Sequence, residues 1–129
     1  MYQIRTILID DDQANLSLMK VLLEKNFPEI DLVEMCHSPE DGMEAITNCL
    51  PDLVFIDIEM PGITGFELLE RLRYNDFDVI FITAHDEYSL QAFKFSALDY
   101  LIKPPKVEDI RHALDRIIQR SNSYITLNQ

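Results

Sequence analysis

The sequence predicts a doubly wound α/β fold, in which a parallel five-stranded sheet is covered by helices on both faces. Two observations support this prediction. Short apolar runs suited to strands alternate with amphipathic stretches suited to helices, five times along the 129 residues. Most of the apolar runs are continuous, as expected of strands that are buried on both faces. Strict alternation of this kind is typical of parallel sheets with right-handed crossovers.

The first strand and helix are predicted close to the N-terminus. Ile7–Ile9 is a short apolar run suited to a buried strand. Leu16, Met19 and Leu23 then recur at intervals of three and four, which is the spacing of one helix face. Pro28 ends the predicted helix, because proline lacks the backbone donor that a further turn needs.

The second strand is predicted at an edge of the sheet. Residues 31–36 alternate polar and apolar side chains, which indicates a strand with only one well-covered face. Ser38 can cap the helix that follows, with Pro39 at its first position. We expect this helix to run to about Cys49, since Pro51 lies just beyond it.

The third unit joins a fully apolar strand to a short loop. The strand is predicted at residues 53–56, and a carboxylate and a Pro-Gly break follow it. Thr64 can cap the next helix. We expect the inner face of that helix to include Phe66, Leu69 and Leu72.

The last two units follow the same plan. Residues 79–83 and 98–102 are predicted as the fourth and fifth strands. Helices are expected at about 87–95 and 107–120. The largely polar residues 121–129 are predicted to form a frayed end or the start of a linker.

The composition excludes several classes of function. Its 23 acidic and 11 basic residues give a net charge of −12, whereas nucleic-acid binding depends on Lys and Arg, so we expect this domain itself to bind no nucleic acid. No apolar run approaches the ~18 residues of a membrane span. No secretory pattern opens the chain, so we expect a cytoplasmic protein without a membrane partner. Cys36 and Cys49 lack metal-ligand spacing and are expected to be reduced thiols.

Reactive side chains follow four of the five predicted strands. Asp10 and Asp11 follow the first strand, Asp57 follows the third, and Lys103 follows the fifth, while Thr83 ends the fourth. In a parallel sheet the carboxyl ends of the strands lie along one edge, where ligands of open α/β sheets bind. We therefore expect these five side chains to converge.

The expected cluster has the groups that phosphoryl transfer needs. Carboxylates that lie close together disfavour one another's charged forms, and a divalent cation relieves this repulsion. Mg²⁺ suits a site of a few carboxylates, waters and phosphate oxygens. A lysine and a hydroxyl can bind the oxygens of the transferred group, because catalysis here is mostly positioning and charge neutralisation. The sequence therefore predicts that Asp57 accepts a phosphoryl group.

Four motifs in this order resemble one family. They are Leu8–Asp12, Asp57–Gly62 with Gly65 after it, Thr83–Ala84 and Tyr100–Pro104. The sequence resembles the receiver (REC) domain of two-component response regulators. The resemblance implies the flavodoxin-like, chemotaxis-receiver form of the doubly wound (βα)5 fold, with strand order 2-1-3-4-5.

The resemblance covers residues 3–120, which we expect to be the receiver domain, and leaves 121–129 as a tail or the start of a linker to an effector domain. The stretch from Thr83 to Pro104 looks most like receivers that precede a LytTR-type DNA-binding domain. The resemblance thus implies transcription regulation as the output. A stand-alone receiver that acts by protein–protein interaction remains an alternative.

The resemblance also implies the roles of the acidic residues. Asp57 would be the phosphorylation site and would accept its phosphoryl group from a sensor histidine kinase in a Mg²⁺-dependent reaction. Asp11, Asp57 and the backbone carbonyl of Glu59 would bind the Mg²⁺ directly, and Asp10 would act largely through water. Taken alone, an aspartate such as Asp10 after a strand would more often be a helix cap.

Further implied roles concern the switch. Thr83 and Lys103 would hold the phosphoryl oxygens, and Thr83 with Tyr100 would form the switch pair. Pro104 would follow a cis peptide bond, and His85 would flank the site together with Glu59, where the two tune the lifetime of the aspartyl phosphate. The changing surface is expected on the fourth helix, fifth strand and fifth helix, where a phosphorylation-dependent homodimer can form.

Three other functions fit the pattern less well. Phosphatases of the haloacid dehalogenase type carry their Asp nucleophile in an Asp-x-Asp motif after the first strand. In this chain the candidate nucleophile, Asp57, follows the third strand. A flavodoxin-like FMN binder needs a Ser/Thr/Gly-rich phosphate loop after the first strand, where this chain has Asp10–Asp12. A receiver that signals without phosphate usually lacks one of the site residues. The sequence thus favours a signalling switch that catalyses only its own phosphorylation and dephosphorylation.

Overall fold

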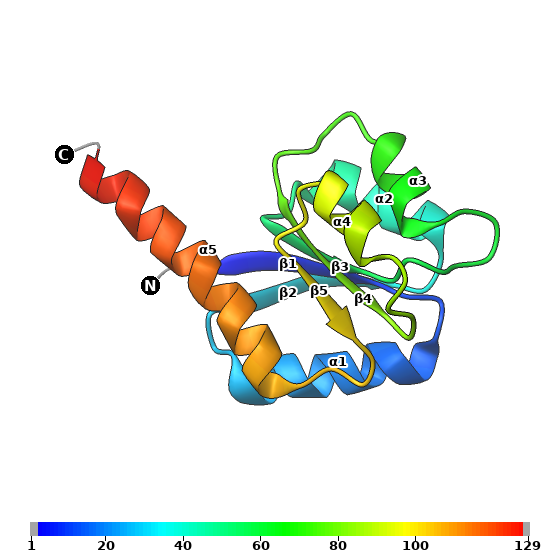
Figure 1. Cartoon of the computed structure of the whole chain (residues 1–129), viewed down its shortest axis with the longest axis horizontal. Coiled ribbons are helices and arrows are strands. Elements are labelled where there is room, and N and C mark those ends of the chain that lie inside the picture. Colours follow the sequence, from blue (N-terminus) through cyan, green and yellow to red (C-terminus); the bar gives the residue numbers. More distant parts are fainter. Residues whose placement is uncertain (1–2, 128–129) are drawn as a thin grey trace.

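One parallel sheet organises the chain. The computed structural model describes residues 3–127, with side chains described as far as Arg120. Its five strands lie in the order β2-β1-β3-β4-β5, and all neighbouring strands are parallel (Figure 1). This confirms the predicted fold class and strand order, including β2 at an edge. The strands are β1 (Ile4–Ile9), β2 (Ile30–Cys36), β3 (Leu53–Ile56), β4 (Asp78–Thr83) and β5 (Asp99–Ile102).

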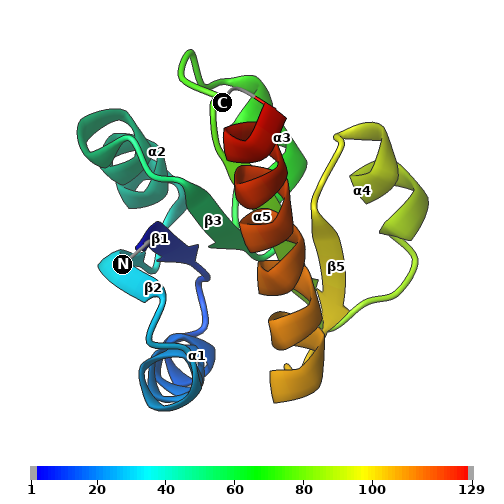
Figure 2. The ribbon, with the colours of Figure 1, turned by 90° about the vertical axis from the view of Figure 1, so that its left-hand side faces the viewer.

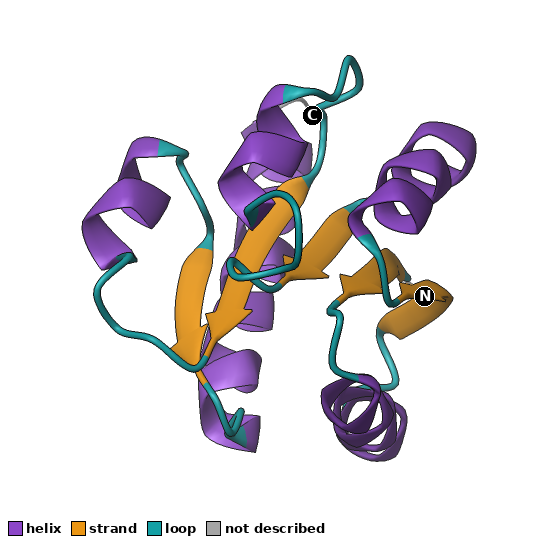
Figure 3. Cartoon of the chain, turned by 90° about the vertical axis from the view of Figure 1, so that its right-hand side faces the viewer, coloured by secondary structure: helices purple, strands orange, loops and turns teal. Residues whose placement is uncertain are grey.

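Helices cover both faces of this sheet. Figure 2 shows α1 below the strands and α2 and α3 above them, and Figure 3 shows the strands as one twisted layer between helices. Among the described residues no helix is both long and apolar enough to cross a membrane. The helices are α1 (Gln13–Asn26), α2 (Pro39–Cys49), α3 (Gly65–Glu70), α4 (Ser89–Lys94) and α5 (Val107–Leu127).

The period-two pattern of the strands divides the core into two layers. Alternate residues of β3 face opposite sides, so Phe55 packs with α1 and α5, whereas Val54 and Ile56 pack with α2, α3 and α4. The same alternation on β4 sends Phe81 to the second layer, where its ring lies 4.8 Å from that of Phe66. Both faces of the central strands are thereby buried, which fixes their register.

Three helices differ from their predicted bounds. The predicted end of the last helix at about Arg120 is wrong, because α5 continues to Leu127 and extends beyond the sheet (Figure 1). No Gly or Pro interrupts the chain after Val107, so no residue breaks the helix. The fourth helix is shorter than predicted: Tyr88 makes no side-chain cap, and Ser96 has a positive φ of 57° just beyond the other end.

The short third helix also corrects its predicted inner face. Thr64 caps it as expected, in a capping box with Glu67. The helix ends at Glu70, however, so Leu72 lies outside it. Leu68 is fully buried beside Phe66, whereas Leu69 and Leu72 are only partly buried, because a helix of this length presents little more than one turn to the sheet.

The two cysteines are free thiols, as predicted. Cys36 is buried at the end of β2, and Cys49 is partly buried at the end of α2. Burial, with the nearby Glu34 and Asp41 charges, raises the pKa of the Cys36 thiol to about 12. The thiolate form of Cys36 is therefore scarce at neutral pH.

Candidate functional site

The sheet itself positions the site. At the carboxyl end of β3 the amide of Asp57 donates to the carbonyl of Ile9 at 3.0 Å, and the amide of Lys103 donates to the carbonyl of Thr83 at 2.8 Å. These bonds extend the strand ladders by one residue. The reactive side chains thus leave from backbone that the sheet holds in place.

Four of the predicted residues lie at the carboxyl ends of neighbouring strands, three of them buried and Lys103 partly buried, and we name them the inner cluster: Asp10, Asp57, Thr83 and Lys103. Asp10 and Asp57 are only 2% and 5% exposed, and Thr83 is fully buried. The Lys103 ammonium lies 2.9 Å from Oδ2 of Asp10 and 2.9 Å from Oδ2 of Asp57. One cation therefore bridges two carboxylates at the edge of the sheet.

The charges of the inner cluster depend on one another. Burial raises the pKa of Asp57. The hydrogen bond and charge of Lys103 partly offset this rise, whereas the charge of Asp10 adds to it. Burial alone would lower the pKa of Lys103, but its hydrogen bonds to Asp10 and Asp57 outweigh this and raise it. Lys103 is thus held protonated, and Asp57 carries a charge that the protein interior disfavours.

Asp10 has further partners that orient it. The Asn15 side chain donates to Oδ2 of Asp10 at 2.5 Å, and the amide of Asp12 donates to Oδ1 at 2.9 Å. Asn15, which is 9% exposed on α1, was not among the predicted site residues. A polar residue next to Leu16, on the apolar face of a predicted helix, is the signal that could have found it.

The acidic side chains fit a divalent cation. Oxygens of Asp10, Asp11 and Asp57 lie within 4.8 Å of one another. Asp10 and Asp57 are buried while Asp11 is exposed, so the group opens to solvent on one side. Three carboxylate donors with room for water are the ligand set that Mg²⁺ prefers. The amide of Glu59 donates to Oδ1 of Asp57 at 3.2 Å, which brings the Glu59 backbone against this group.

The predicted switch residues, Thr83 and Tyr100, are connected through the loop after β4, because each of them bonds to residues of that loop. The amide of His85 lies 3.4 Å from the Thr83 hydroxyl. Tyr100, partly buried on β5, donates its hydroxyl proton to the carbonyl of His85 and accepts from the amide of Tyr88 at 3.2 Å. The Lys103–Pro104 peptide bond is cis.

A second, exposed group lies outside the inner cluster. We name it the rim: Glu59, His85, Glu87 and Tyr88. The Tyr88 hydroxyl donates to Oε1 of Glu59 at 2.6 Å, and Nε2 of His85 lies 3.0 Å from Oε2 of Glu59. The Glu59 carboxylate accepts this proton and thereby raises the pKa of Tyr88 to about 12. Glu59 and His85 were predicted to flank the site, whereas no role was predicted for Tyr88.

Comparison with known proteins gives a family match. The model of the response regulator receiver domain matches residues 6–115. LytT of Bacillus anthracis, a sensory transduction protein, is 33% identical and covers 98% of this chain and 52% of its own length. BtsR of Escherichia coli K12, a transcriptional regulatory protein, is 32% identical over 96% of this chain and 52% of its own length. The chain thus spans about half the length of these curated relatives.

Solved structures agree on the fold. The REC domain of AraT, a response regulator from Geobacillus stearothermophilus, superposes with a TM-score of 0.81 at 22% identity, covering 94% of this chain and 97% of its own. A response regulator receiver domain protein from Methanospirillum hungatei has a TM-score of 0.77 at 26% identity, with coverages of 95% and 98%.

Proposed function

This chain belongs to the response regulator receiver domain family, and from that premise we propose that Asp57 is its phosphoacceptor. The observation that supports the proposal best is the Lys103 ammonium, 2.9 Å from the buried carboxylates of both Asp57 and Asp10. A cation held so close to a carboxylate can neutralise an incoming phosphoryl group as well. The chain is a signalling switch, and its only chemistry is on its own aspartate.

The proposed reaction is an in-line phosphoryl transfer. A carboxylate oxygen of Asp57 forms a bond to phosphorus while the bond from phosphorus to the donor breaks. The donor is a phosphohistidine of a sensor histidine kinase, whose imidazole nitrogen keeps the electron pair of the broken bond. Hydrolysis of the aspartyl phosphate by water later returns the Asp57 carboxylate and inorganic phosphate.

The residues that would hold Mg²⁺ are Asp11, Asp57 and the backbone carbonyl of Glu59, with Asp10 acting through water. The closeness of the acidic oxygens, within 4.8 Å of one another, supports this set. When bound, the ion supplies positive charge to the phosphoryl oxygens. Lys103 would supply a second positive charge, since its ammonium lies 2.9 Å from Oδ2 of Asp57, and its contact with Asp10 holds it in that position.

The switch would begin at Thr83 and end at Tyr100. A phosphoryl oxygen that draws the Thr83 hydroxyl toward Asp57 removes the acceptor of the His85 amide. The carbonyl of His85 in turn accepts the Tyr100 hydroxyl, so movement of the loop frees the Tyr100 ring to turn inward. Phosphorylation would thereby shift the population toward a different surface on α4, β5 and α5, where a homodimer can form.

The output is proposed from the relatives. LytT is a sensory transduction protein and BtsR a transcriptional regulatory protein, and each is about twice as long as the matched segment. We propose that residues 3–120 form the receiver of a regulator of this kind, and that the remaining half of such a protein is a LytTR-type DNA-binding domain. A receiver that acts by protein–protein contact alone is the second possibility.

Intact-mass measurement after incubation with acetyl phosphate tests the proposal. Wild type with Mg²⁺ is expected to gain one phosphate, and EDTA is expected to prevent the gain. Asp57→Ala should gain none. Asp76→Ala removes an exposed aspartate that lies before the start of β4, whereas Thr83 ends that strand, and this variant should behave as wild type. A phosphate adduct that persists in Asp57→Ala would place the acceptor elsewhere and overturn the proposal.

A further inference from the structure

The rim brings together metal-binding side chains from two loops. Glu59 lies on the loop after β3, and His85 and Glu87 lie on the loop after β4. One nitrogen of His85 and one carboxylate oxygen of each glutamate all lie within 4.8 Å of one another. Imidazole nitrogens and carboxylate oxygens are both ligands of Zn²⁺ in proteins. The fold thus gathers three side chains that can bind the same ion.

The distances within this group are close to those of a metal site. Oε2 of Glu59 lies 3.0 Å from Nε2 of His85, and Oε1 of Glu87 lies 3.5 Å from Nδ1 of His85. Two ligand atoms of one Zn²⁺ are roughly 3.3 Å apart, because each lies about 2.0–2.2 Å from the metal. One ion takes only one ring nitrogen, so one glutamate has to turn. The Glu87 side chain, which is 59% exposed, can do so without losing a buried contact.

The charge of the rim favours a cation. His85 is the only basic partner of Glu59 and of Glu87 among the ion pairs of the described residues. Asp86, which is also exposed, adds a third acidic residue next to His85 in sequence. Carboxylates that lie close together disfavour one another's charged forms, and a divalent cation relieves this repulsion.

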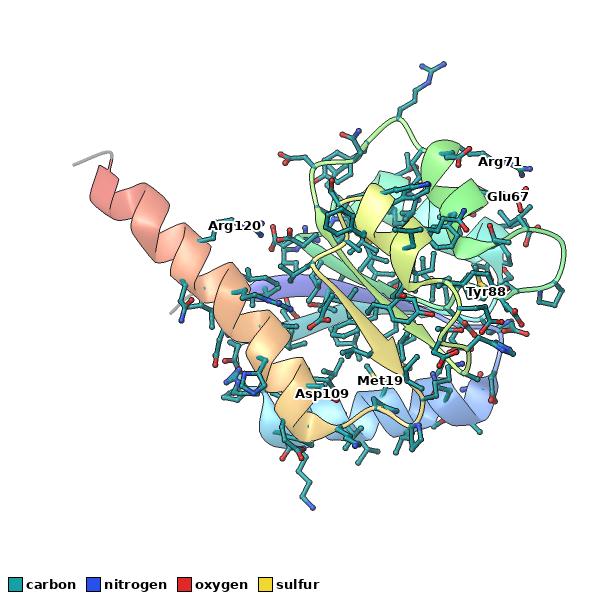
Figure 4. All side chains as sticks on the ribbon, viewed as in Figure 1. Met19, Glu67, Arg71, Tyr88, Asp109 and Arg120 are labelled. Carbon is teal, nitrogen blue, oxygen red and sulfur yellow. The ribbon has the colours of Figure 1, made fainter. Side chains whose placement is uncertain are left out.

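Tyr88 orients one of the three ligands. Its hydroxyl donates to Oε1 of Glu59 at 2.6 Å, while Oε2 of the same carboxylate faces His85. The Tyr88 ring lies 6.2 Å from the ring of Phe66, which is 2% exposed, so the donor is set against the core. Figure 4 shows Tyr88 on the side of the molecule where the strands end. Carboxylates that bind metals are commonly held by such a hydrogen bond from a neighbouring group.

We propose that Glu59, His85 and Glu87 form a second metal site, which takes a divalent transition-metal ion such as Zn²⁺. The three side chains supply one nitrogen and two oxygens, and water completes the coordination. The acidic group around Asp57 offers oxygens only, which suits Mg²⁺, whereas an imidazole nitrogen favours Zn²⁺, Ni²⁺ or Cu²⁺. The two sites therefore differ in the ion that they select.

Calorimetric titration with Zn²⁺ in excess Mg²⁺ tests the site. Wild type is expected to bind one Zn²⁺, and His85→Ala should lower the affinity at least about tenfold, since even groups that only orient a ligand contribute that much. His37→Ala and His112→Ala are the matched controls, because both histidines are exposed and lie elsewhere, on the loop after β2 and on α5. Both should keep the wild-type affinity. A wild type that binds no Zn²⁺ would overturn the inference.

Two conservative variants distinguish a three-ligand site from a lone histidine. Glu59→Gln and Glu87→Gln keep the size of each side chain but remove its charge, and each should weaken Zn²⁺ binding. Glu44→Gln, at an exposed position of α2, is the control and should not. Thermal melting reports any loss of fold, and Zn²⁺ should raise the melting temperature of wild type. Unchanged affinity in both rim variants would overturn the site.

NMR spectroscopy locates the ion. Co²⁺ is paramagnetic and accepts the same ligands as Zn²⁺, so it broadens the ring-proton signals of the histidine that it binds. The His85 signals, identified by their absence in His85→Ala, should disappear first as Co²⁺ is added. Loss of the His37 or His112 signals at the same or lower Co²⁺ would overturn the inference. Cys49→Ser should leave Zn²⁺ binding unchanged, and a loss of binding in that variant would place the ion on the thiol instead.

This site does not depend on phosphorylation. Asp57→Ala removes a carboxylate of the inner cluster and is expected to bind Zn²⁺ as wild type does. Zn²⁺ binding at the rim together with no phosphate adduct in wild type would mean that the proposed function alone fails. Loss of Zn²⁺ binding in Asp57→Ala would place the ion in the inner cluster and overturn the second site.

Discussion

The inner cluster and the rim come from the same two strand ends, yet they differ in how they are held. Asp57 and Thr83 are at most 5% exposed, whereas Glu59 and His85, two residues farther along the same loops, have side chains 46% and 44% exposed. The inner cluster balances buried carboxylates with one lysine. The rim makes its side-chain contacts at the exposed surface, where such contacts contribute little.

This difference separates the chemistry from its control. Buried groups hold their geometry because moving them leaves a charge unpaired in the interior, which is costly. Exposed groups can exchange partners with water at low cost, so they are free to open and close. The inner cluster therefore keeps the geometry that the proposed phosphoryl transfer needs, whereas the contacts of the rim can rearrange without unpairing a buried charge.

The largest effect is expected when the inner cluster loses its cation. Lys103→Ala leaves Asp10 and Asp57 buried without their shared partner, which should lower the free energy of unfolding by about 3 kcal/mol. Some phosphorylation of Asp57 should persist in this variant. Beryllofluoride, which mimics the phosphoryl group, should however no longer change the spectrum of the folded protein. Urea unfolding measures the first effect, with Lys106→Ala as the control, because Lys106 is an exposed lysine three residues farther along the same loop.

The pH dependence of the same variant follows from the raised pKa of Lys103. A lysine whose pKa is higher in the folded than in the unfolded protein stabilises the fold fully below its ordinary pKa of 10.5. That contribution disappears as the pH rises through the higher, folded value. The stability difference between wild type and Lys103→Ala should therefore be constant near neutrality and shrink above the ordinary lysine pKa. It should also shrink at acidic pH, where the Asp57 carboxylate, whose pKa is raised, takes up a proton and no longer needs the cation. A difference that shrinks within the neutral range would contradict this account of the Lys103 charge.

The next largest effect is expected at Gly65, where the backbone of the site is crowded. A Cβ at this position would lie 2.6 Å from the carbonyl oxygen of Asp57 and 3.3 Å from Cα of Ile58. Both obstacles are backbone, so Gly65→Ala should cost about 2 kcal/mol by overpacking and displace Asp57. Chemical denaturation and Mg²⁺ titration measure the two effects.

Gly42→Ala provides the comparison for this crowding. Its new Cβ would lie 2.7 Å from Cδ1 of Ile9, the far end of a side chain that can rotate. A smaller loss of stability and unchanged Mg²⁺ affinity are expected. Equal losses in the two variants would mean that the site backbone is no more rigid than the core around it.

A smaller effect, of opposite sign, is expected for Asp57→Asn. Burial makes the Asp57 charge unfavourable, so removing it should raise the metal-free free energy of unfolding by about 1 kcal/mol. Addition of Mg²⁺ should stabilise wild type and leave the variant unchanged. Thermal melting with and without Mg²⁺ checks both points, and a variant less stable than metal-free wild type would contradict them.

The inner cluster was predictable because backbone rules decide it. A residue that directly follows a parallel strand lies at the carboxyl edge of the sheet, so the sequence alone predicted that Asp10, Asp57 and Lys103 lie close together. The strand order was confirmed for the same reason. The convergence of these side chains needs no knowledge of rotamers, since the ladder places each Cα.

The contact of Tyr88 and two other features were not predictable in this way. Tyr88 reaches Glu59 through a loop whose path no periodic pattern describes, and Asn15 was hidden in the apolar face of a helix. The end of α5 at Leu127 could not be predicted, because the helix continues into a largely polar stretch where no hydrophobic spacing marks its end. The hydrophobic periodicity of the sequence thus predicts which residues pack against the sheet, whereas side-chain contacts between loops can be identified only in the structure.

The smallest effect is expected for Glu87→Gln at the outer side of the rim. Glu87 lies 3.5 Å from Nδ1 of His85, with the two side chains 59% and 44% exposed, so the pair should contribute at most about 0.5 kcal/mol. The variant should also leave the rates of phosphorylation by acetyl phosphate and of phosphate loss unchanged, since Glu87 makes no contact with the inner cluster among the described contacts. Denaturation and the time course of the phosphate adduct in intact-mass measurements check this. If Glu87→Gln altered either rate, the charge of the rim would act on the reaction at Asp57, contrary to the separation of the two groups.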